Sequence, residues 1–218
     1  MTEPESLQAF LRDCLVVRRH LPWPRFDLSG AKWRLLVERL ASEDWELLAL
    51  WGDRLAVHVL IRDPAAGELA VLTRETVGRN FESLGAVRPG MIRLERAVRE
   101  LTGLQATDAI DKRPWLDHGR WPVRHPLAVV PGSRPAGPSP AAADYPFLAV
   151  EGEGLHQIPV GPVHAGIIEP GHFRFHANGE TVVRLEERLG WTHKGTERLM
   201  QGKSVAEAAL LAGRVSGD

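Results

Sequence analysis

The first hundred residues alternate between the hydrophobic periodicities of helices and of strands. Residues 4–19 carry an apolar stripe at helical spacing, which predicts an amphipathic helix ending before His20. A second helix follows Ser29, a side chain suited to capping it, and a third is predicted over residues 91–102 with Gly103 as its stop. The expected inward positions are Trp33, Leu36, Val37 and Leu40 in the second helix, and Met91, Leu94, Ala97, Val98 and Leu101 in the third.

Three segments between these helices show the pattern of strands. Residues 45–51 form a short apolar run, residues 54–62 alternate between apolar and polar, and residues 68–75 continue that alternation. Short connections rich in Asp, Pro and Gly join them, so we expect an antiparallel meander. The predicted class for residues 1–130 is therefore α+β, with helices packed on one face of an antiparallel sheet.

The character of the chain changes after the third helix. Residues 110–127 are rich in Trp, Arg, His and Pro without periodicity, which predicts an irregular segment held by side-chain contacts. Residues 131–145 are rich in Pro, Ala, Gly and Ser, a composition typical of an exposed linker that is partly polyproline II. We therefore place a domain boundary there, with a second region over residues 146–218.

The second region is predicted to be a hairpin followed by two short helices. Strands are expected over residues 165–177 and 181–189 around Asn178-Gly179, a strong turn signal. A short helix over residues 196–201 precedes a last helix that the capping box Ser204 to Glu207 opens. Elements of this size bury little apolar surface by themselves, which indicates a region that needs a partner.

Composition excludes several classes of protein. With 44% hydrophobic residues the chain can form a core, and a net charge of −1 argues against a nucleic-acid-binding protein. No apolar run reaches the roughly 18 residues of a membrane span, and no signal peptide is expected. We expect a cytoplasmic protein that contacts the inner membrane only through partners. Cys14, the single cysteine, is expected to be a buried core thiol, and one thiol cannot hold an iron–sulfur cluster.

Motifs for catalysis are absent from the sequence. Neither G-x-S-x-G, nor G-x-G-x-x-G, nor a P-loop occurs. His172 and His176 could share a strand face, but with no cysteine nearby and no H-E-x-x-H motif we predict no metal site. The run of acidic and basic residues from Glu95 to Glu100 is most simply a solvated helix face. No residue is therefore assigned a catalytic role.

Residues 92–127 resemble the signature of the C-type subunit family of complex I (NADH:quinone oxidoreductase). The matching positions are Glu95-Arg96, Leu101-Thr102-Gly103-Leu104, Arg113, Leu116, Trp121 and Pro126-Leu127. The resemblance implies a protein that docks onto iron–sulfur and catalytic subunits, with Glu95, Arg96, Arg113 and Trp121 as candidate docking residues. It also implies that the iron–sulfur clusters and the quinone are held by those partner subunits, and that this chain binds no cofactor.

Residues 161–200 resemble the start of the D-type subunit family of complex I and of nickel–iron hydrogenase large subunits, in the form found in membrane-bound hydrogenases. The match comprises Gly161-Pro162-x-His164 and Leu189-Gly190-x-x-His193-Lys194-Gly195-x-Glu197. The resemblance implies that His172 and His193 lie near a quinone. Hydrogenases continue with E-R-[IV]-C-G-x-C, whereas this chain has Gly213, Arg214, Val215 and Ser216. Because Ser216 stands at the cysteine position, nickel chemistry is not expected.

Two functions follow from these resemblances. The first is a docking subunit, without redox centres, of an NADH:quinone oxidoreductase-like or membrane-hydrogenase-like complex, whose C-terminal hairpin completes a partner's sheet. The alternative is a scaffold or assembly protein derived from such a subunit and without a role in turnover. A third option is a homo-oligomer that exchanges its hairpin between copies.

Overall fold

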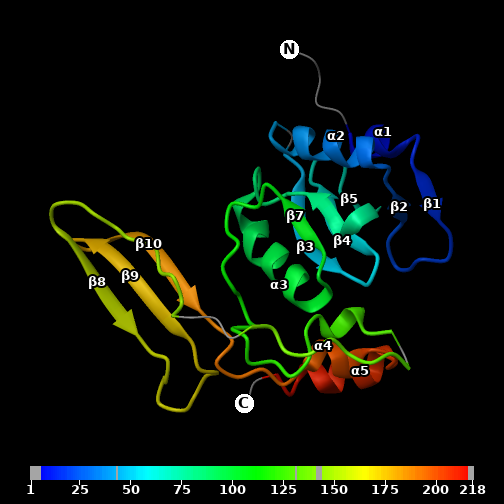
Figure 1. Ribbon diagram of the computed structural model, residues 1–218. Helices are drawn as coiled ribbons and strands as arrows, with labels where there is room; N and C mark the ends of the chain where they lie inside the picture. Colours follow the sequence, from blue (N-terminus) through cyan, green and yellow to red (C-terminus); the bar gives the residue numbers. More distant parts are fainter. Residues whose placement is uncertain (1–5, 43, 131, 141–143, 216–218) are drawn as a thin grey trace. The chain divides into compact units, whose positions relative to one another are not determined.

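The computed structural model describes residues 6–42, 44–130, 132–140 and 144–215 (Figure 1). The chain folds into two compact units, which are described separately. The first comprises residues 1–112 and 124–136, and the second comprises residues 113–123 and 137–218. The predicted boundary at residues 131–145 stays a prediction, and residues 131 and 141–143 of that linker, like Ser216, lie outside the described residues.

The first unit is built on a five-stranded sheet in the order β1-β2-β5-β4-β3. Its strands are β1 (Leu15–Val17), β2 (Arg25–Asp27), β3 (Glu46–Gly52), β4 (Ala56–Asp63) and β5 (Glu68–Glu75). The predicted meander is confirmed, because β3, β4 and β5 pair antiparallel in sequence order. Strand β2 extends the sheet by pairing parallel to β5, an addition that the sequence did not predict.

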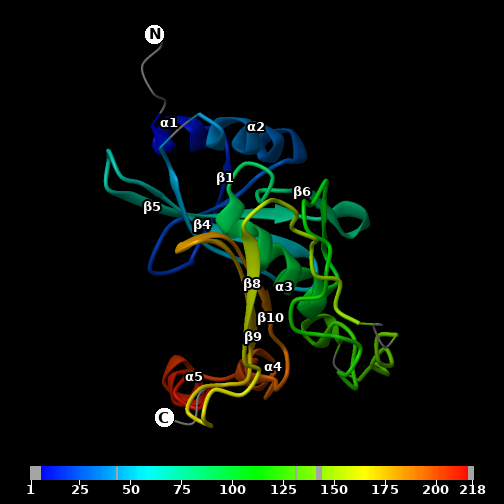
Figure 2. The ribbon, with the colours of Figure 1, turned by 90° about the vertical axis from the view of Figure 1, so that its left-hand side faces the viewer.

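Helices α1 (Leu7–Leu11) and α2 (Gly30–Leu40) lie side by side over one face of this sheet (Figure 2). Ser29 caps α2 as predicted, since its hydroxyl accepts a hydrogen bond from the Lys32 N–H. The core lies between these helices and the sheet, and Trp33 of α2 is completely buried in it. Further core side chains are Phe10, Leu36, Leu40, Val57, Val59, Ile61 and Leu72.

Helix α3 (Ile92–Thr102) ends at Gly103, as predicted, in the left-handed conformation with φ of 77°. A Cβ at Gly103 would lie 2.7 Å from Arg79 Nη2, so the left-handed turn and the close approach both favour glycine. Two short strands, β6 (Asn80–Glu82) and β7 (Gln105–Thr107), pair parallel to each other. Single 3-10 turns occur at Val77–Arg79, Pro89–Met91 and Pro126–Ala128. The α+β class is confirmed.

The predicted helix over residues 4–19 is wrong beyond Leu11. The chain leaves α1 at Arg12 and enters β1, where Leu15 pairs with Asp27 and Val17 pairs with Arg25. Neighbouring β-branched residues favour an extended backbone, and pairing with β2 stabilises it more than a longer helix would. Residues 4 and 5 of the prediction lie outside the described residues.

The second unit contains a three-stranded antiparallel sheet in the order β10-β9-β8. Strands β9 (His172–Asn178) and β10 (Thr181–Arg188) form the predicted hairpin, in which Asn178 pairs with Thr181. The strand expected from residue 165 begins only at His172, because turns occupy residues 165–167 before it. Strand β8 (Leu155–Val160) was not predicted, since Pro159 interrupts its pattern.

Two short helices follow the hairpin, α4 (Thr196–Met200) and α5 (Val205–Ala212). The predicted capping box is confirmed: Ser204 accepts from the Glu207 N–H, and the Glu207 carboxylate accepts from the Ser204 N–H. No side chain of α5 is buried. Within the described ranges, no helix has both the length and the apolar character needed to cross a bilayer.

Candidate functional site

Glu186 on β10 joins three segments of the second unit through one buried carboxylate. Its Oε1 accepts from Arg113 Nη1 at 2.6 Å and from the Leu148 N–H at 3.1 Å. His176 Nε2 lies 3.3 Å from Oε2 and is almost completely buried. Burial raises the pKa of the Glu186 carboxyl, but the hydrogen bonds from Arg113, Leu148 and His176 outweigh it and hold that pKa below its usual range.

Residues 113–123 lie within the segment 110–127 that was predicted to be irregular, and side-chain contacts hold them as predicted. His118 Nε2 lies 2.8 Å from the carbonyl oxygen of Leu189, at the end of the hairpin. Leu116 lies against Gly190, whose φ is 74°, and a Cβ at Gly190 would approach the Leu116 carbonyl oxygen to 2.0 Å. Only glycine therefore fits at position 190. Arg113 and Trp121, two predicted docking residues, both lie in this segment.

His193 has a defined tautomer. Its Nδ1 accepts a hydrogen bond from the Gly195 N–H at 3.0 Å, so the ring proton lies on Nε2. That nitrogen is 3.4 Å from Glu197 Oε2, four residues further on, without forming a hydrogen bond with it. The ring of Trp121 packs on His193 with 4.6 Å between centroids. His193 is thus held by the Gly195 N–H on one side and by the Trp121 ring on the other.

His193 lines an apolar cavity of about 490 Å³. Its walls include Leu116, Pro170, Phe173, Leu189, Met200 and Val215. Lys194 also lines it, and its Nζ donates to Glu169 Oε1 at 2.8 Å and to the Val215 carbonyl at 2.9 Å. A cavity of this volume can hold a small molecule or an apolar side chain of a partner.

His172, the other residue predicted to be near a quinone, does not line this cavity. Its Nδ1 lies 3.4 Å from the Gly161 carbonyl oxygen, and its ring packs edge-on against Phe147. His172 and His176 share a face of β9, but His176 is engaged by Glu186. In the part of the chain that the structure describes, no three His, Cys, Asp or Glu side chains form a group that could hold a metal. The proximity of His172 and His193 to a quinone stays a prediction.

Glu95 and Arg96 on α3 are not on a solvated face, which corrects the expectation for this helix. Glu95 is 4% exposed, and its carboxylate accepts from the Leu84 N–H at 2.7 Å and from the Gly85 N–H at 2.9 Å. The Ser83 hydroxyl donates to the same carboxylate at 2.9 Å. Burial raises the pKa of Glu95 in spite of these donors. Arg96, 5% exposed, pairs with Asp111 at 3.1 Å.

The four predicted docking residues therefore make contacts within their own units. Glu95 fixes the turn at residues 83–85, and Arg96 holds the chain after β7 through Asp111. Arg113 binds the sheet of the second unit, and Trp121 packs on His193. Their docking role stays a prediction, and these contacts show that they shape the surface around them. Helical periodicity does not reveal buried ion pairs, so only the structure shows these contacts.

The three-stranded sheet has one polar face and one apolar face, assigned from the register of its pairs. The face called apolar carries Ile158, Val160, Phe173, Phe175, Val182 and Leu185, and the same register places Ala177 on it and His156 and Glu187 at its border. Its exposure is high, with Ile158 45% and Leu185 47% exposed. Phe173 belongs both to this face and to the wall of the His193 cavity, so the two form one continuous surface. The alternation of residues 172–177 is the sequence signal that could have indicated this face.

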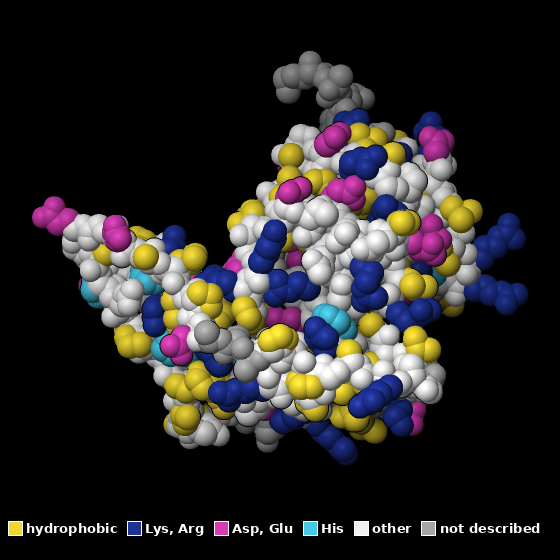
Figure 3. All heavy atoms as spheres, in the orientation of Figure 1, with side chains coloured by type: hydrophobic (Ala, Val, Ile, Leu, Met, Phe, Trp, Pro, Cys, Tyr) yellow, Lys and Arg dark blue, Asp and Glu magenta, His cyan; other side chains and the backbone are white. Residues whose placement is uncertain are grey.

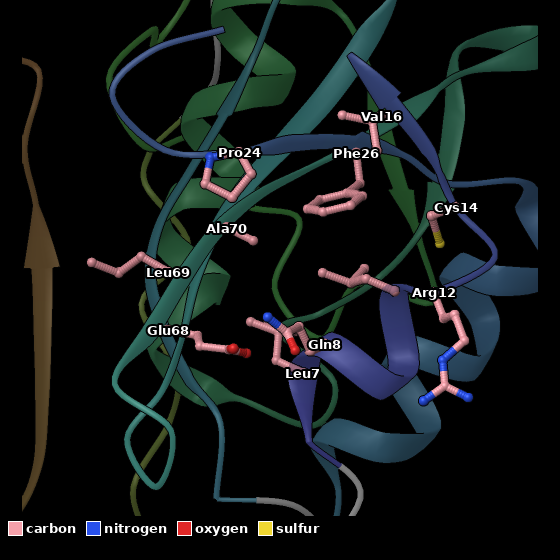
Figure 4. Close-up of a pocket in the computed structure, with 11 residues that line it drawn as sticks. Leu7, Gln8, Arg12, Cys14, Val16, Pro24, Phe26, Glu68, Leu69 and Ala70 are labelled. Atoms are coloured by element: carbon pink, nitrogen blue, oxygen red, sulfur yellow. The ribbon is translucent and has the colours of Figure 1, made fainter. Parts of the chain in front are cut away.

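A second cavity, of about 570 Å³, lies in the first unit between α1 and the strands β1, β2 and β5 (Figure 4). Leu7, Leu11, Val16, Phe26 and Cys14 line it. Cys14 was expected to be a buried core thiol, but the structure shows it half-buried at the cavity wall, because α1 ends before reaching it.

We expect Cys14 to react slowly with iodoacetamide in the folded protein. Burial raises the pKa of its thiol, and the nearby Lys32 lowers it only in part. At pH 8 the thiolate fraction is then smaller than in a free peptide, so alkylation should be slower by about fivefold or more. The rate is measured by mass spectrometry, with the urea-unfolded chain as control. Equal rates in the folded and unfolded chains would contradict the expectation.

No protein-family model matches the chain. It is 34% identical over 144 residues to hydrogenase-4 component G of Escherichia coli (strain K12), a match covering 64% of this chain and 26% of that protein. It is 33% identical over 135 residues to formate hydrogenlyase subunit 5 of the same strain, covering 59% and 24%. A carbon monoxide-induced hydrogenase of Rhodospirillum rubrum is 37% identical over 60 residues, covering 28% and 17%.

The chain therefore spans about a quarter of the length of the first two relatives. A chain of the membrane-bound sulfane sulfur reductase, an archaeal respiratory membrane complex, is similar with a TM-score of 0.36 and 12% identity, covering 46% of this chain and 68% of that chain. The resemblance to hydrogenase proteins is thus confirmed for homologous segments. The fusion of a C-type region with a D-type region of complex I stays a prediction.

Proposed function

We propose that this chain is a docking subunit, without redox centres of its own, of a membrane-hydrogenase-like or complex I-like oxidoreductase. The observation that carries the proposal is its similarity over 144 residues to a protein named as a hydrogenase component. The exposed apolar side chains of the sheet and of helix α5 support it, because apolar surface of this kind is typical of protein interfaces. Iron–sulfur clusters and quinone are then bound by the partner subunits.

Within the assembly, this chain is proposed to support the transfer of electrons to quinone. His193 supports this only through its place, because an imidazole ring at the wall of an apolar cavity suits a flat ligand with a carbonyl oxygen. Membrane attachment in this proposal comes from the partner subunits.

The test is purification of the tagged full chain from gently solubilised membranes, followed by mass spectrometry and by activity assays. We expect iron–sulfur and hydrogenase-like subunits in near-equal amounts, and loss of hydrogen-linked or quinone-linked electron transfer from membranes of a deletion strain. A monomer or self-dimer, with membrane activity unchanged by the deletion, would overturn the proposal.

The scaffold function is the second candidate, supported by Ser216 at the position where hydrogenases carry a nickel-ligating cysteine. It predicts that the chain is present during assembly and absent from the mature complex. Stoichiometric retention in the active complex would exclude it.

A further inference from the structure

The sheet of the second unit presents to solvent the face that proteins normally bury. An antiparallel sheet exposed on one side usually turns its polar face outward and covers its apolar face. Here the chain covers the polar face instead. Arg174 stacks on Phe147 at 3.7 Å, Arg184 donates to the Ala149 carbonyl at 3.2 Å, and Glu186 accepts from the Leu148 N–H.

On the opposite face the loop before β9 covers only one border, where the His164 ring packs on Phe173 with 5.5 Å between centroids, and Ala177 is buried. The side chains of Ile158, Val182 and Leu185 remain 45%, 52% and 47% exposed. Six apolar side chains over three strands form a contiguous patch, and Phe173 extends it into the cavity beside His193. Single exposed apolar residues need no explanation, but a contiguous patch on a regular element indicates a binding surface.

The edges of the same sheet are poor templates for adding a strand. Strand β8 contains Pro159, which lacks an N–H donor, and β10 has a bulge between Val182 and Arg184 that interrupts its ladder. Both features are typical of edges protected against pairing. The face is therefore the better candidate for an interface than the hairpin edge, which the sequence had suggested would complete a partner's sheet.

Charge at the border of the apolar face restricts its occupant. Glu151, Glu153 and Glu180 are exposed at the end of the sheet where the hairpin turns. Figure 3 shows acidic side chains (magenta) gathered at that end of the sheet. At the other end Arg188 stacks on Trp191 and Lys194 pairs with Glu169. A second copy would bring the same acidic border to the end where the hairpin turns, so it fits less well than a partner with a basic border.

We infer that this face binds a partner subunit through an apolar patch bordered by lysine or arginine, with one apolar side chain of the partner entering the His193 cavity. The inference rests on the proposed function and adds to it the surface and the chemistry of the partner. Contacts of this kind place the strongest interactions at the apolar centre and use charge at the border for selectivity.

The experiment introduces a photo-crosslinking phenylalanine analogue into the full chain in its own cells, at Leu185 or at Gln157. These positions lie on opposite faces of the same sheet, and Gln157 is exposed and serves as the matched control. We expect crosslinks from position 185 to one protein that also co-purifies with the unmodified chain, at a peptide rich in apolar residues and flanked by basic ones. Position 157 should give at least tenfold fewer crosslinks to that protein.

A second set of variants tests the same face by affinity. Ile158→Lys with Leu185→Lys should reduce retention of the partner at least tenfold, whereas Gln157→Lys should change it less than twofold. Circular dichroism of each purified variant checks its fold. If the double variant is unfolded, the crosslinking experiment decides the test, because it needs no lysine on this face. Crosslinks to a second copy or to residues 1–112 of this chain would overturn the inference.

Two failures are distinguishable. Full retention of the partner by a folded double variant, with no crosslink from position 185, overturns the choice of face and leaves the proposed function standing. Absence of any retained subunit with the unmodified chain overturns both.

Discussion

Glu186→Ala is expected to destabilise the second unit by about 2 kcal/mol, because it removes the carboxylate beside the buried His176 ring and an acceptor of the partly buried Arg113 guanidinium. The substitution takes away the acceptor for the Arg113 guanidinium and for the Leu148 N–H, and the carboxylate beside His176. The His176 ring does not gain water easily, since His176 is 1% exposed and Glu186 5% exposed, whereas the Arg113 side chain is 18% exposed.

The measurement is amide hydrogen exchange along β9 and β10 in the full chain. Two compact units need not unfold together, so a single denaturation midpoint would not report on one of them. Glu180→Ala is the control, because this exposed glutamate lies in the turn of the same hairpin, and it should change the stability by less than about 0.5 kcal/mol. Equal protection in both variants would refute the role of Glu186.

The pH dependence of this effect has a defined sign. Since the folded pKa of Glu186 lies below the ordinary value of 4.5, its ionised form stabilises the fold. That contribution is present above about pH 4.5 and is lost as the pH falls through the folded pKa. Glu186→Gln removes it, so the gap between the unsubstituted chain and this variant should narrow as the solution is acidified.

Glu95→Ala is expected to cost about 3 kcal/mol in the first unit, from two backbone N–H groups and one hydroxyl left without their acceptor. The affected donors are Ser83, Leu84 and Gly85 in the turn that packs on α3. Exchange of the α3 and β6 amides reports the loss. Glu46→Ala, which removes an exposed ion pair with Arg62, is the control and should cost less than about 1 kcal/mol.

Glu95→Gln should behave in the opposite way to Glu186→Gln. The fold raises the pKa of Glu95, so its protonated form is favoured in the native state, and that stabilisation is lost as the pH rises through the folded value. A neutral amide keeps an acceptor for the two N–H groups and does not ionise. As the pH rises above the ordinary value of 4.5, the variant should therefore gain stability relative to the unsubstituted chain. Parallel pH profiles would contradict this sign.

Local patterns in the sequence were sufficient to predict elements that depend on near neighbours. The cap at Ser29, the stop at Gly103, the turn at Asn178-Gly179 and the capping box at Ser204 are all as predicted. Each is fixed by hydrogen bonds or backbone conformation within a few residues, which explains why sequence alone reveals it.

Long-range pairing could not be predicted in this way. Strand β1 depends on β2 across the loop that joins them, and β8 depends on β9 across residues 161–171, which include several turns. The burial of Glu95 depends on three donors at residues 83–85, several helical turns away in sequence. A charged helix face and a buried ion-pair face have the same periodicity, and only the partner segment distinguishes them.

The path of the backbone between the two units has a practical consequence for expressing parts of this protein. Residues 113–123 belong to the second unit, whereas residues 124–136 return to the first. A fragment starting at residue 146 would lack Arg113 and His118, and Glu186 and the Leu189 carbonyl would lose their partners. A fragment ending at residue 130 would contain Leu116 but lack Gly190, against which Leu116 packs. No single cut within residues 131–145 therefore yields two complete units. Two fragments made by such a cut should reassociate less well than two domains between which the chain passes only once.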